Sequence, residues 1–440
     1  MNPTKSFGCD SRLLHEKALR MIPGGAHTYA KGDDQFPEIA PSFIVRGSGS
    51  HVWGVDGREY IEFGMGLRAV TLGHAFEPVI KAAAAQLPLG TNFTRPSPIE
   101  VECAEELLEL LPGAEMVKFC KDGSMAVDGA IKLARAHTSR DMIAICGDHP
   151  FFSTADWFIG TTGMPAGIPK WVREQTVKFR YNDIASLEAL FEKYPGEIAC
   201  VIMEAARTEE PVQGFLQAVK ACTHRNGALF VLDEMITGFR WHLQGAQHEY
   251  DVTPDLATFG KALANGFSVS ALTGKREFMQ LGGLNHDRER VFLLSTTHGA
   301  ETHGLAAALA TIRFYKQNPV IETLYSRGNK LRNGLQQVIK ELKLDSHFDL
   351  VSRDCNLIFG TRDAEGVPSQ AFRTLFMQEL ISRGVIAPAF VVSYSHTEID
   401  IDHTIDAATE ALVIYRKALE DGIENYLKSR PVKPVFRPYA

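Results

Sequence analysis

Several features of common protein classes are missing from this sequence. No stretch approaches the roughly 20 apolar residues that a helix needs to span a bilayer. The N-terminus lacks the charged and then apolar segments of a signal peptide. Long basic runs and interleaved aromatic and basic residues are also absent, and the net charge is −7. We therefore expect neither a membrane nor a nucleic acid as the main partner.

Cysteine is scarce and irregularly placed. The seven cysteines are an odd number, are widely spread and form no C-x-x-C motif. This pattern argues against a disulfide framework and against a zinc site, and it fits a reducing compartment. We therefore expect a cytoplasmic protein with no bound metal.

The remaining composition is that of an ordinary globular protein. The chain has 440 residues, of which 45% are hydrophobic and 22% are charged, enough for two or three packing units. A helix is predicted over residues 10–21, ending before a Pro-Gly-Gly segment. Short strand-like pieces follow at residues 42–46, 51–53 and 59–63. They predict a small antiparallel section.

From about residue 76, helical stretches alternate with short apolar runs. These runs are Met116–Cys120, Met142–Cys146, Ala199–Met203, Leu229–Leu232, Leu256–Phe259 and Val269–Thr273. Such runs are typical of buried strands in a mainly parallel sheet, and their alternation with helices indicates an α/β fold. After about residue 310 the chain is helical again, with strands near Leu357–Gly360. We predict a large domain over residues 76–310 and a small α+β domain from residues 1–75 and 311–440.

Three polar residues stand at the ends of three apolar runs. They are Glu204, Asp233 and Lys261. Ligands bind at the carboxyl ends of strands in open α/β sheets, so these side chains are candidates to converge on one ligand. The alternative is that each residue only marks where a strand emerges into solvent.

A fourth segment, Lys121-Asp122-Gly123-Ser124, lies between an apolar run and a predicted helix. The helix is predicted from the i, i+3, i+4, i+7 spacing of Val127, Ala130, Ile131 and Ala134. Gly123 and Ser124 then lie at its N-terminus, where exposed N–H groups and the helix dipole favour an anion. The alternative is that Ser124 is only the N-cap.

Together these groups match the needs of one cofactor. Pyridoxal phosphate (PLP) requires an anion site, a carboxylate at its ring nitrogen and a lysine that forms a Schiff base. Asp233 would keep the ring nitrogen protonated. Lys261 would form the Schiff base and, once freed by substrate, would carry a proton, which requires a lowered pKa. We therefore predict an enzyme that makes an amine from a carbonyl compound, or the reverse.

Longer motifs extend over nearly the whole chain. They are MIPGGAHT, VWGVDGREYIEFGMG, LGHAFEPV, EMVKFCKDGSMAVDGAIKLARAHTSR, VIMEA, LFVLDEMITGFR, TFGKALANGF, STTHGAE and SHTEID. With these motifs the sequence resembles the class III (ω-type) aminotransferases of fold type I, and within them the glutamate-1-semialdehyde aminomutase branch. The resemblance implies a fold type I architecture with a large PLP-binding domain.

The resemblance assigns further cofactor contacts. Gly123, Ser124 and Met125 match the phosphate-binding segment, with Met125 where a glutamate is usual. Phe151 matches the aromatic residue that stacks on the cofactor ring, and Phe152 is the alternative stacking residue. Core packing is the other interpretation of both phenylalanines.

The resemblance also implies contacts on the other side of the cofactor and across a dimer. Met235 would pack on the opposite ring face, and Glu204 would lie near the 3′ oxygen of the cofactor and the entrance of the site. Thr296, with Thr297 as a close alternative, would reach the phosphate of a neighbouring subunit. A homodimer with shared active sites is therefore implied.

Departures from the family pattern concern the substrate. Lys31 stands where the aminomutases have an arginine for the substrate carboxylate, and the segment before Glu398 is short and lacks their acid. Arg207 is an additional cation that either holds a substrate carboxylate or pairs with Glu209 or Glu210. His298 and Glu301 place further polar groups near the phosphate segment.

These departures favour a two-substrate aminotransferase over an internal aminomutase. We expect glutamate as the amino donor and a polar, acidic carbonyl compound as the acceptor. A keto or aldehyde sugar acid is one such acceptor, and the sequence resembles the 8-amino-3,8-dideoxy-octulosonate transaminases, which make an amino sugar for lipopolysaccharide biosynthesis. The alternatives are an aminomutase or racemase on the same cofactor, and a regulatory protein that binds PLP without turnover.

Overall fold

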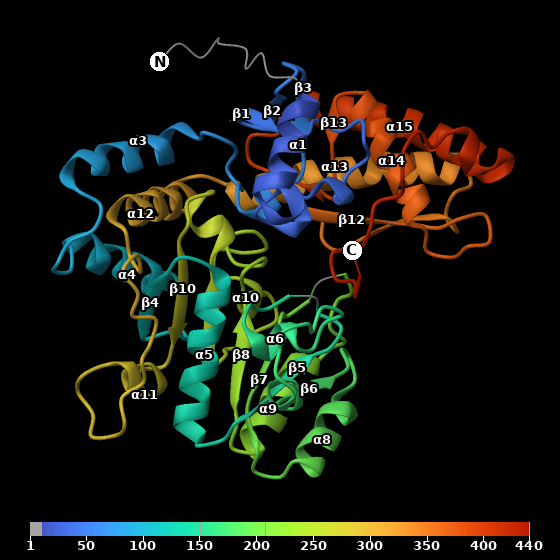
Figure 1. The fold of residues 1–440 in the computed structure, drawn as a ribbon. Coiled ribbons are helices and arrows are strands. Elements are labelled where there is room, and N and C mark those ends of the chain that lie inside the picture. The colour runs from blue at the N-terminus through green and yellow to red at the C-terminus, as the bar shows by residue number, and fades with distance from the viewer. Residues whose placement is uncertain (1–10, 150, 207, 440) are drawn as a thin grey trace. The chain divides into compact units, whose positions relative to one another are not determined.

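The computed structural model describes residues 11–149, 151–206 and 208–439. The chain forms two compact units (Figure 1). One contains the described residues up to Phe76 together with Glu322–Arg437, and the other contains Glu77–Ile321. The expected boundary at residue 310 falls inside helix α12 (Thr302–Gln317). Among the described helices, none is long and apolar enough to cross a bilayer.

The Glu77–Ile321 unit is built on a mixed, mostly parallel sheet. Within the described residues its order is β4-β10-β9-β8-β7-β5-β6. The strands are β4 Met116–Cys120, β5 Met142–Cys146, β6 Thr176–Phe179, β7 Ile198–Met203, β8 Leu229–Asp233, β9 Leu256–Phe259 and β10 Ser270–Gly274. Neighbours from β6 to β9 run parallel, whereas β10 is antiparallel to β4 and β9. The predicted α/β class is therefore confirmed.

Helices that contact strands of this sheet include α4 Pro98–Leu110, α5 Gly123–Thr138, α8 Ile184–Lys193 and α9 Phe215–Arg225. Helix α12 packs instead on α3 Glu77–Gln86 and on α4. Helix α5 contacts β7, β9 and β10, while α9 contacts β8. The central strands β5, β7 and β8 are buried along their whole length, which explains their unbroken apolar sequences.

The other unit contains two small sheets and three long helices. One sheet has the order β1-β2-β3-β13 and the second has the order β11-β12-β14. The strands are β1 Ile44–Ser48, β2 His51–Gly54, β3 Glu59–Glu62, β11 Phe348–Val351, β12 Asn356–Thr361, β13 Val385–Ile386 and β14 Phe390–Val391. The helices are α13 Val320–Glu341, α14 Gln370–Ser382 and α15 Glu398–Asp421. The first three strands form the predicted antiparallel section, and β13 joins β3 in parallel.

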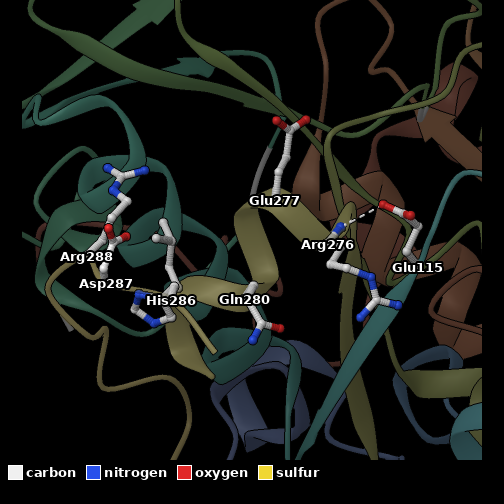
Figure 2. A pocket seen from close by; sticks show the side chains of 8 residues that line it. Glu115, Arg276, Glu277, Gln280, His286, Asp287 and Arg288 are labelled. Atoms are coloured by element: carbon white, nitrogen blue, oxygen red, sulfur yellow. Dashed lines mark hydrogen bonds between the residues drawn. The ribbon is translucent and has the colours of Figure 1, made fainter. Parts of the chain in front are cut away.

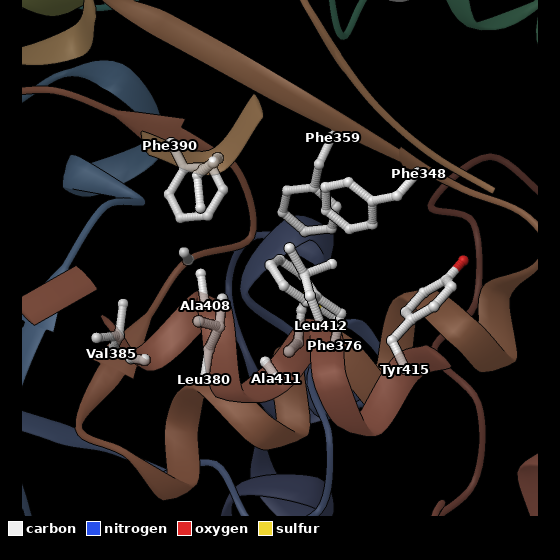
Figure 3. Close-up of a cluster of buried hydrophobic side chains, with 14 of the residues drawn as sticks. Phe348, Phe359, Phe376, Leu380, Val385, Phe390, Ala408, Ala411, Leu412 and Tyr415 are labelled. Atoms are coloured by element: carbon white, nitrogen blue, oxygen red, sulfur yellow. The ribbon is translucent and has the colours of Figure 1, made fainter. Parts of the chain in front are cut away.

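An apolar core fills this unit. In Figure 3 the rings of Phe348 and Phe359 face Phe376 of α14 and Leu412 of α15. The ring centroids of Phe376 lie 4.8 Å from Phe348 and 5.0 Å from Phe359, in edge-to-face arrangements. These rings dominate the packing of the unit because aromatic side chains bury large apolar areas.

One carboxylate ties the two chain ends of this unit together. The Ser50 hydroxyl donates to Asp400 Oδ2 at 2.9 Å, and His51 Nε2 lies 3.0 Å from Asp400 Oδ1. Asp400 also accepts the Thr397 N–H at 2.7 Å in the capping box of α15. The start of β2 and the start of α15 are thus held by the same side chain.

Candidate active site

The carboxyl ends of β7, β8 and β9 lie along one edge of the large sheet. These strands are parallel neighbours, with Met203 opposite Leu232 and Asp233 opposite Thr258. Asp233 is the last residue of β8, Glu204 directly follows β7, and both are buried. Lys261 follows β9 after a single glycine. The sheet therefore brings the three predicted strand-end residues to a common edge.

Asp233 is a buried carboxylate beside a lysine. Its Oδ1 accepts the Met235 N–H at 2.8 Å and the Thr258 hydroxyl at 3.3 Å. Burial raises the pKa of Asp233, and the nearby positive charge of Lys261 acts in the opposite direction. Such a carboxylate is stabilised by a cationic N–H, whether this comes from Lys261 or from a bound ligand.

The backbone at Lys261 is unusual. Its φ is +45°, in the left-handed region, which costs roughly 1–2 kcal/mol for a residue with a side chain. A Cβ on Gly260 would lie 2.4 Å from Ser270 Oγ and 2.7 Å from Met235 Sδ, so only glycine fits before the lysine. Strained backbone of this kind persists where the surrounding structure holds a functional side chain in place.

The N-terminus of α5 has two N–H groups directed away from the helix. Asp122, and not Ser124, is the N-cap, because its Oδ1 accepts the Met125 N–H at 2.9 Å. The Met125 N–H that was expected to face a phosphate is therefore already engaged. Within the described residues the N–H groups of Gly123 and Ser124 donate no hydrogen bond, which leaves them for an anion.

Met235 connects this N-terminus with the lysine segment. A Cβ on Gly123 would lie 2.8 Å from Met235 Sδ, and the same sulfur faces Gly260. The predicted contacts at Gly123, Met235 and Lys261 therefore occur side by side. The arrangement fits a flat ligand with an anionic group at the helix end and a reactive carbon at the lysine.

The two phenylalanines differ in their surroundings. The Phe151 side chain is 42% exposed and meets Phe158 edge-to-face at 5.5 Å between centroids. Phe152 is only 2% exposed and lies 5.7 Å from the Phe158 ring. Phe152 thus packs in the interior, whereas Phe151 has an accessible ring.

His149 is a strand-end residue that the sequence reasoning missed. It follows β5, is buried, and accepts the Glu204 N–H at Nδ1 over 3.0 Å. Its ring centroid lies 5.1 Å from Tyr181 and 6.3 Å from Phe152. His149 lies three residues beyond the end of β5, after Gly147 and Asp148, so the rule that selected Glu204 directly after its strand would have selected Asp148 instead.

The segment before α12 lies beside the phosphate segment of its own chain. Thr296 and Thr297 are exposed, and the Thr297 carbonyl accepts from Asn92 Nδ2 at 2.9 Å. Lys121 Nζ lies 2.6 Å from Glu301 Oε2, and His298 Nδ1 lies 3.1 Å from Glu301 Oε1. These ion pairs lower the pKa of Glu301, with the hydrogen bond from Lys121 as the main cause.

The two predicted substrate cations do not belong to the described part of the Glu77–Ile321 unit. Lys31 belongs to the other compact unit, where it is exposed at the end of a short 3₁₀ turn, Tyr29–Lys31. Arg207 lies outside the described residues.

A surface hollow of about 470 Å³ lies at the opposite edge of the sheet. Glu115 precedes β4 and Arg276 follows β10, and Figure 2 shows their side chains with His286, Asp287 and Arg288 around it. Acidic and basic groups are mixed in this lining. The hollow shares no residue with the strand-end site.

Comparisons with known proteins show the family of this chain. The family profile described as Aminotransferase class-III matches residues 29–350. Glutamate-1-semialdehyde 2,1-aminomutase of Desulforamulus reducens is 33% identical over 91% of this chain and 97% of that protein. 3-Aminobutyryl-CoA aminotransferase of Cloacimonas acidaminovorans is 31% identical over 93% of this chain and 98% of that protein. The solved PLP internal aldimine form of the Sphingopyxis sp. MTA144 FumI protein has a TM-score of 0.86 at 28% identity and covers 96% of this chain and 98% of its own.

Proposed function

Because this chain belongs to the class-III aminotransferase family, we propose that it is a PLP-dependent aminotransferase acting at the carboxyl edge of its large sheet. The observation that carries the proposal is the placement of buried Asp233 beside Lys261. The open N–H groups of Gly123 and Ser124 complete the arrangement. The fold is that of fold type I PLP-dependent enzymes.

The residues at this edge fit PLP. The N–H groups of Gly123 and Ser124 would hold the phosphate, and Asp233 would hold a proton on the ring nitrogen. Met235 and one of the aromatic residues that follow β5 would enclose the ring. When bound, PLP supplies a carbonyl for the amine of Lys261 and a ring that accepts electrons.

Lys261 has two roles in this proposal. It binds the cofactor covalently, and its amine moves a proton to and from the α-carbon of the substrate once substrate has replaced it. In the protein without cofactor, the positive charge of Lys261 lies beside the buried carboxylate of Asp233. Glu204 and His149, which are joined by a hydrogen bond, would border the cofactor on the side of β5 and β7.

Thr296 or Thr297 supports a further element of the proposal, a homodimer. Both residues are exposed in the segment before α12, as expected for residues that complete the phosphate site of a second subunit. Size measurement combined with Thr296→Val and Thr297→Val variants tests this point. Weaker PLP binding in a dimer that persists supports a shared site, and a monomer with full PLP affinity contradicts it.

For the substrates, we propose glutamate as donor and a polar, acidic carbonyl compound as acceptor. Lys31 offers a point charge for a carboxylate, and the segment before Glu398 lacks an acid that would repel it. Keto and aldehyde sugar acids, including 8-oxo-3,8-dideoxy-octulosonate, belong to this acceptor class. The cation Arg207 would add to the same preference.

An aminomutase is the second candidate, favoured by the names of several curated relatives. The two candidates differ in their need for an external amino donor. The protein loaded with pyridoxamine phosphate is mixed with a panel of sugar acids, 2-oxo acids and glutamate-1-semialdehyde, and each product is identified by mass. Amination of a sugar acid and bleaching of visible absorbance by glutamate support the aminotransferase. Conversion of glutamate-1-semialdehyde without a donor supports the aminomutase, and no turnover with PLP bound would indicate a regulatory protein.

A further inference from the structure

Two side chains of helix α5 accept hydrogen bonds from residues 153–157. The Ser124 hydroxyl accepts the Thr154 N–H at 3.1 Å. One turn further on, Asp128 Oδ1 accepts both the Ser153 hydroxyl at 2.8 Å and the Trp157 indole N–H at 2.7 Å. The four-residue spacing places Ser124 and Asp128 on the same face of the helix.

Burying the carboxylate of Asp128 costs free energy that an apolar side chain at the same position would not cost. Ser153 and Trp157 are buried, and burial raises the pKa of Asp128 despite the two hydrogen bonds that lower it. Charge-assisted hydrogen bonds are stronger and more directional than an apolar contact. Without Asp128, the indole N–H and the Ser153 hydroxyl would be left in the interior without this acceptor.

Ring contacts connect Trp157, which is hydrogen-bonded to Asp128, with the aromatic residues that follow β5. The Trp157 ring lies 5.8 Å from Phe158, which meets Phe151 and Phe152 at 5.5 and 5.7 Å. Phe152 in turn lies 6.3 Å from His149. A continuous row of rings thus leads from Asp128 to the carboxyl edge of the sheet.

We propose that Asp128 is a positioning residue that holds the side chains of His149, Phe151 and Phe152 in place relative to the N-terminus of α5. The hydrogen bonds that Ser124 and Asp128 accept from Ser153, Thr154 and Trp157 are called the clasp. The clasp fixes the distance between the N–H groups at the helix end and the rings that follow β5. This inference rests on the proposed function, in which those N–H groups hold the phosphate and one of those rings covers the cofactor. Asp128 itself does not touch the cofactor in this proposal.

The test compares Asp128→Ala, Asp128→Asn and wild type. Hydrogen exchange is measured over residues 149–158 in protein freed of PLP, and the circular dichroism band of bound PLP is measured in the loaded protein. Asp128→Ala should speed exchange of this segment by about tenfold or more, because both hydrogen bonds that Asp128 accepts are lost. It should also weaken the dichroism band and lower kcat more than it raises KM for glutamate. Asp128→Asn should restore most of each signal, because an amide oxygen still accepts both hydrogen bonds.

Asp255 provides a matched control. It is a buried carboxylate of the same unit that accepts Lys275 Nζ at 2.8 Å and the Phe230 N–H at 2.8 Å, and it precedes β9 at the other edge of the sheet. Asp255→Asn should lower stability without changing exchange at residues 149–158 or the dichroism band.

Two results would overturn the clasp. One is wild-type exchange and dichroism in Asp128→Ala, and the other is the same set of changes in Asp255→Asn, which would indicate general destabilisation. Failure of the proposed function is distinguishable, because wild-type protein would then show no PLP band. The exchange measurement in PLP-free protein would still decide whether the clasp exists.

Discussion

The core of the small unit and the carboxyl edge of the large sheet are equally buried but chemically opposite. Phe348, Phe376 and Leu412 surround one another with apolar atoms, and their burial stabilises the fold. Asp233 and Glu234 are equally inaccessible, yet burial of a carboxylate costs free energy unless its oxygens are paired. The favourable free energy of burying the apolar core thus offsets the unfavourable free energy of burying carboxylates at the edge of the sheet.

The two neighbouring carboxylates at the edge also differ from each other. Glu234 accepts the Ala246 and Gln247 N–H groups, each at 2.8 Å, and the Thr237 hydroxyl. All of its partners belong to the loop between β8 and β9, so its role is to hold that loop. Asp233 instead lies beside Lys261 and serves the site.

Of the substitutions that separate the active site from the apolar core, Lys261→Ala should have the largest effect on turnover. Lys261→Ala should lower amine transfer from glutamate roughly 10⁴-fold or more, because no other amine replaces it in the same position. The unfolding free energy without PLP should fall by about 1–3 kcal/mol, because buried Asp233 loses the neighbouring positive charge of Lys261. Turnover and urea unfolding measure the two quantities, and retained turnover would refute the role of Lys261.

A substitution in the apolar core of the small unit should lower stability strongly and leave the active site unchanged. Phe376→Ala should lower the unfolding free energy by about 3–5 kcal/mol, because it removes a ring from a filled core. The absorbance of bound PLP in the folded fraction should not change. Val413→Ala on α15 is the control, since Val413 is exposed and its truncation should cost no more than about 0.5 kcal/mol. A loss below that size at Phe376 would contradict the assigned core.

Asp233→Asn tests whether a buried carboxylate of the site serves catalysis and not stability. The charge opposite the cofactor ring nitrogen is lost, so kcat should fall about 100-fold. The fold should not lose more than about 1 kcal/mol, because the lost partner of Lys261 is offset by a lower desolvation cost. A variant that unfolds like Phe376→Ala, with normal kcat in its folded fraction, would show that Asp233 is structural.

The smallest effect concerns pH and Glu234. Burial raises the pKa of Glu234 from its usual 4.5 to about 7. Native protein therefore binds more protons than unfolded protein between these pH values, and stability is lost as pH rises through about 7. Unfolding free energy of PLP-free protein should fall by about 1–3 kcal/mol from pH 5 to pH 7.5. Glu234→Gln should flatten this slope, and an unchanged slope would assign it to other groups.

The sequence was most informative where a strand is buried on both faces. The bounds of the fully buried strands β5 and β9 agree with the predicted runs, and so do those of the partly exposed edge strand β4. Strand β6 was not predicted, because it is an edge strand in which Val177 is half-buried and Lys178 is exposed. A run of four residues with this mixture is too short a signal to distinguish from a loop.

The site was predictable in its residue types but less so in its local geometry. Asp122 takes the N-cap position because its carboxylate reaches the Met125 N–H, and sequence alone does not choose between Asp122 and Ser124. Likewise, adjacent Phe151 and Phe152 have the same side chain but opposite exposure, which is decided by the path of the loop. Contacts of this kind depend on tertiary packing.

The division of the small unit between both chain ends bears on synthesis. Strand β3 must pair with β13, and Ser50 must meet Asp400, a separation of 350 residues. At roughly 5–20 residues per second, the first strands leave the ribosome tens of seconds before their partners. The large sheet, which is contiguous in sequence, has time to form in that interval, while the edge of β3 that pairs with β13 stays open to other strands until β13 has been made.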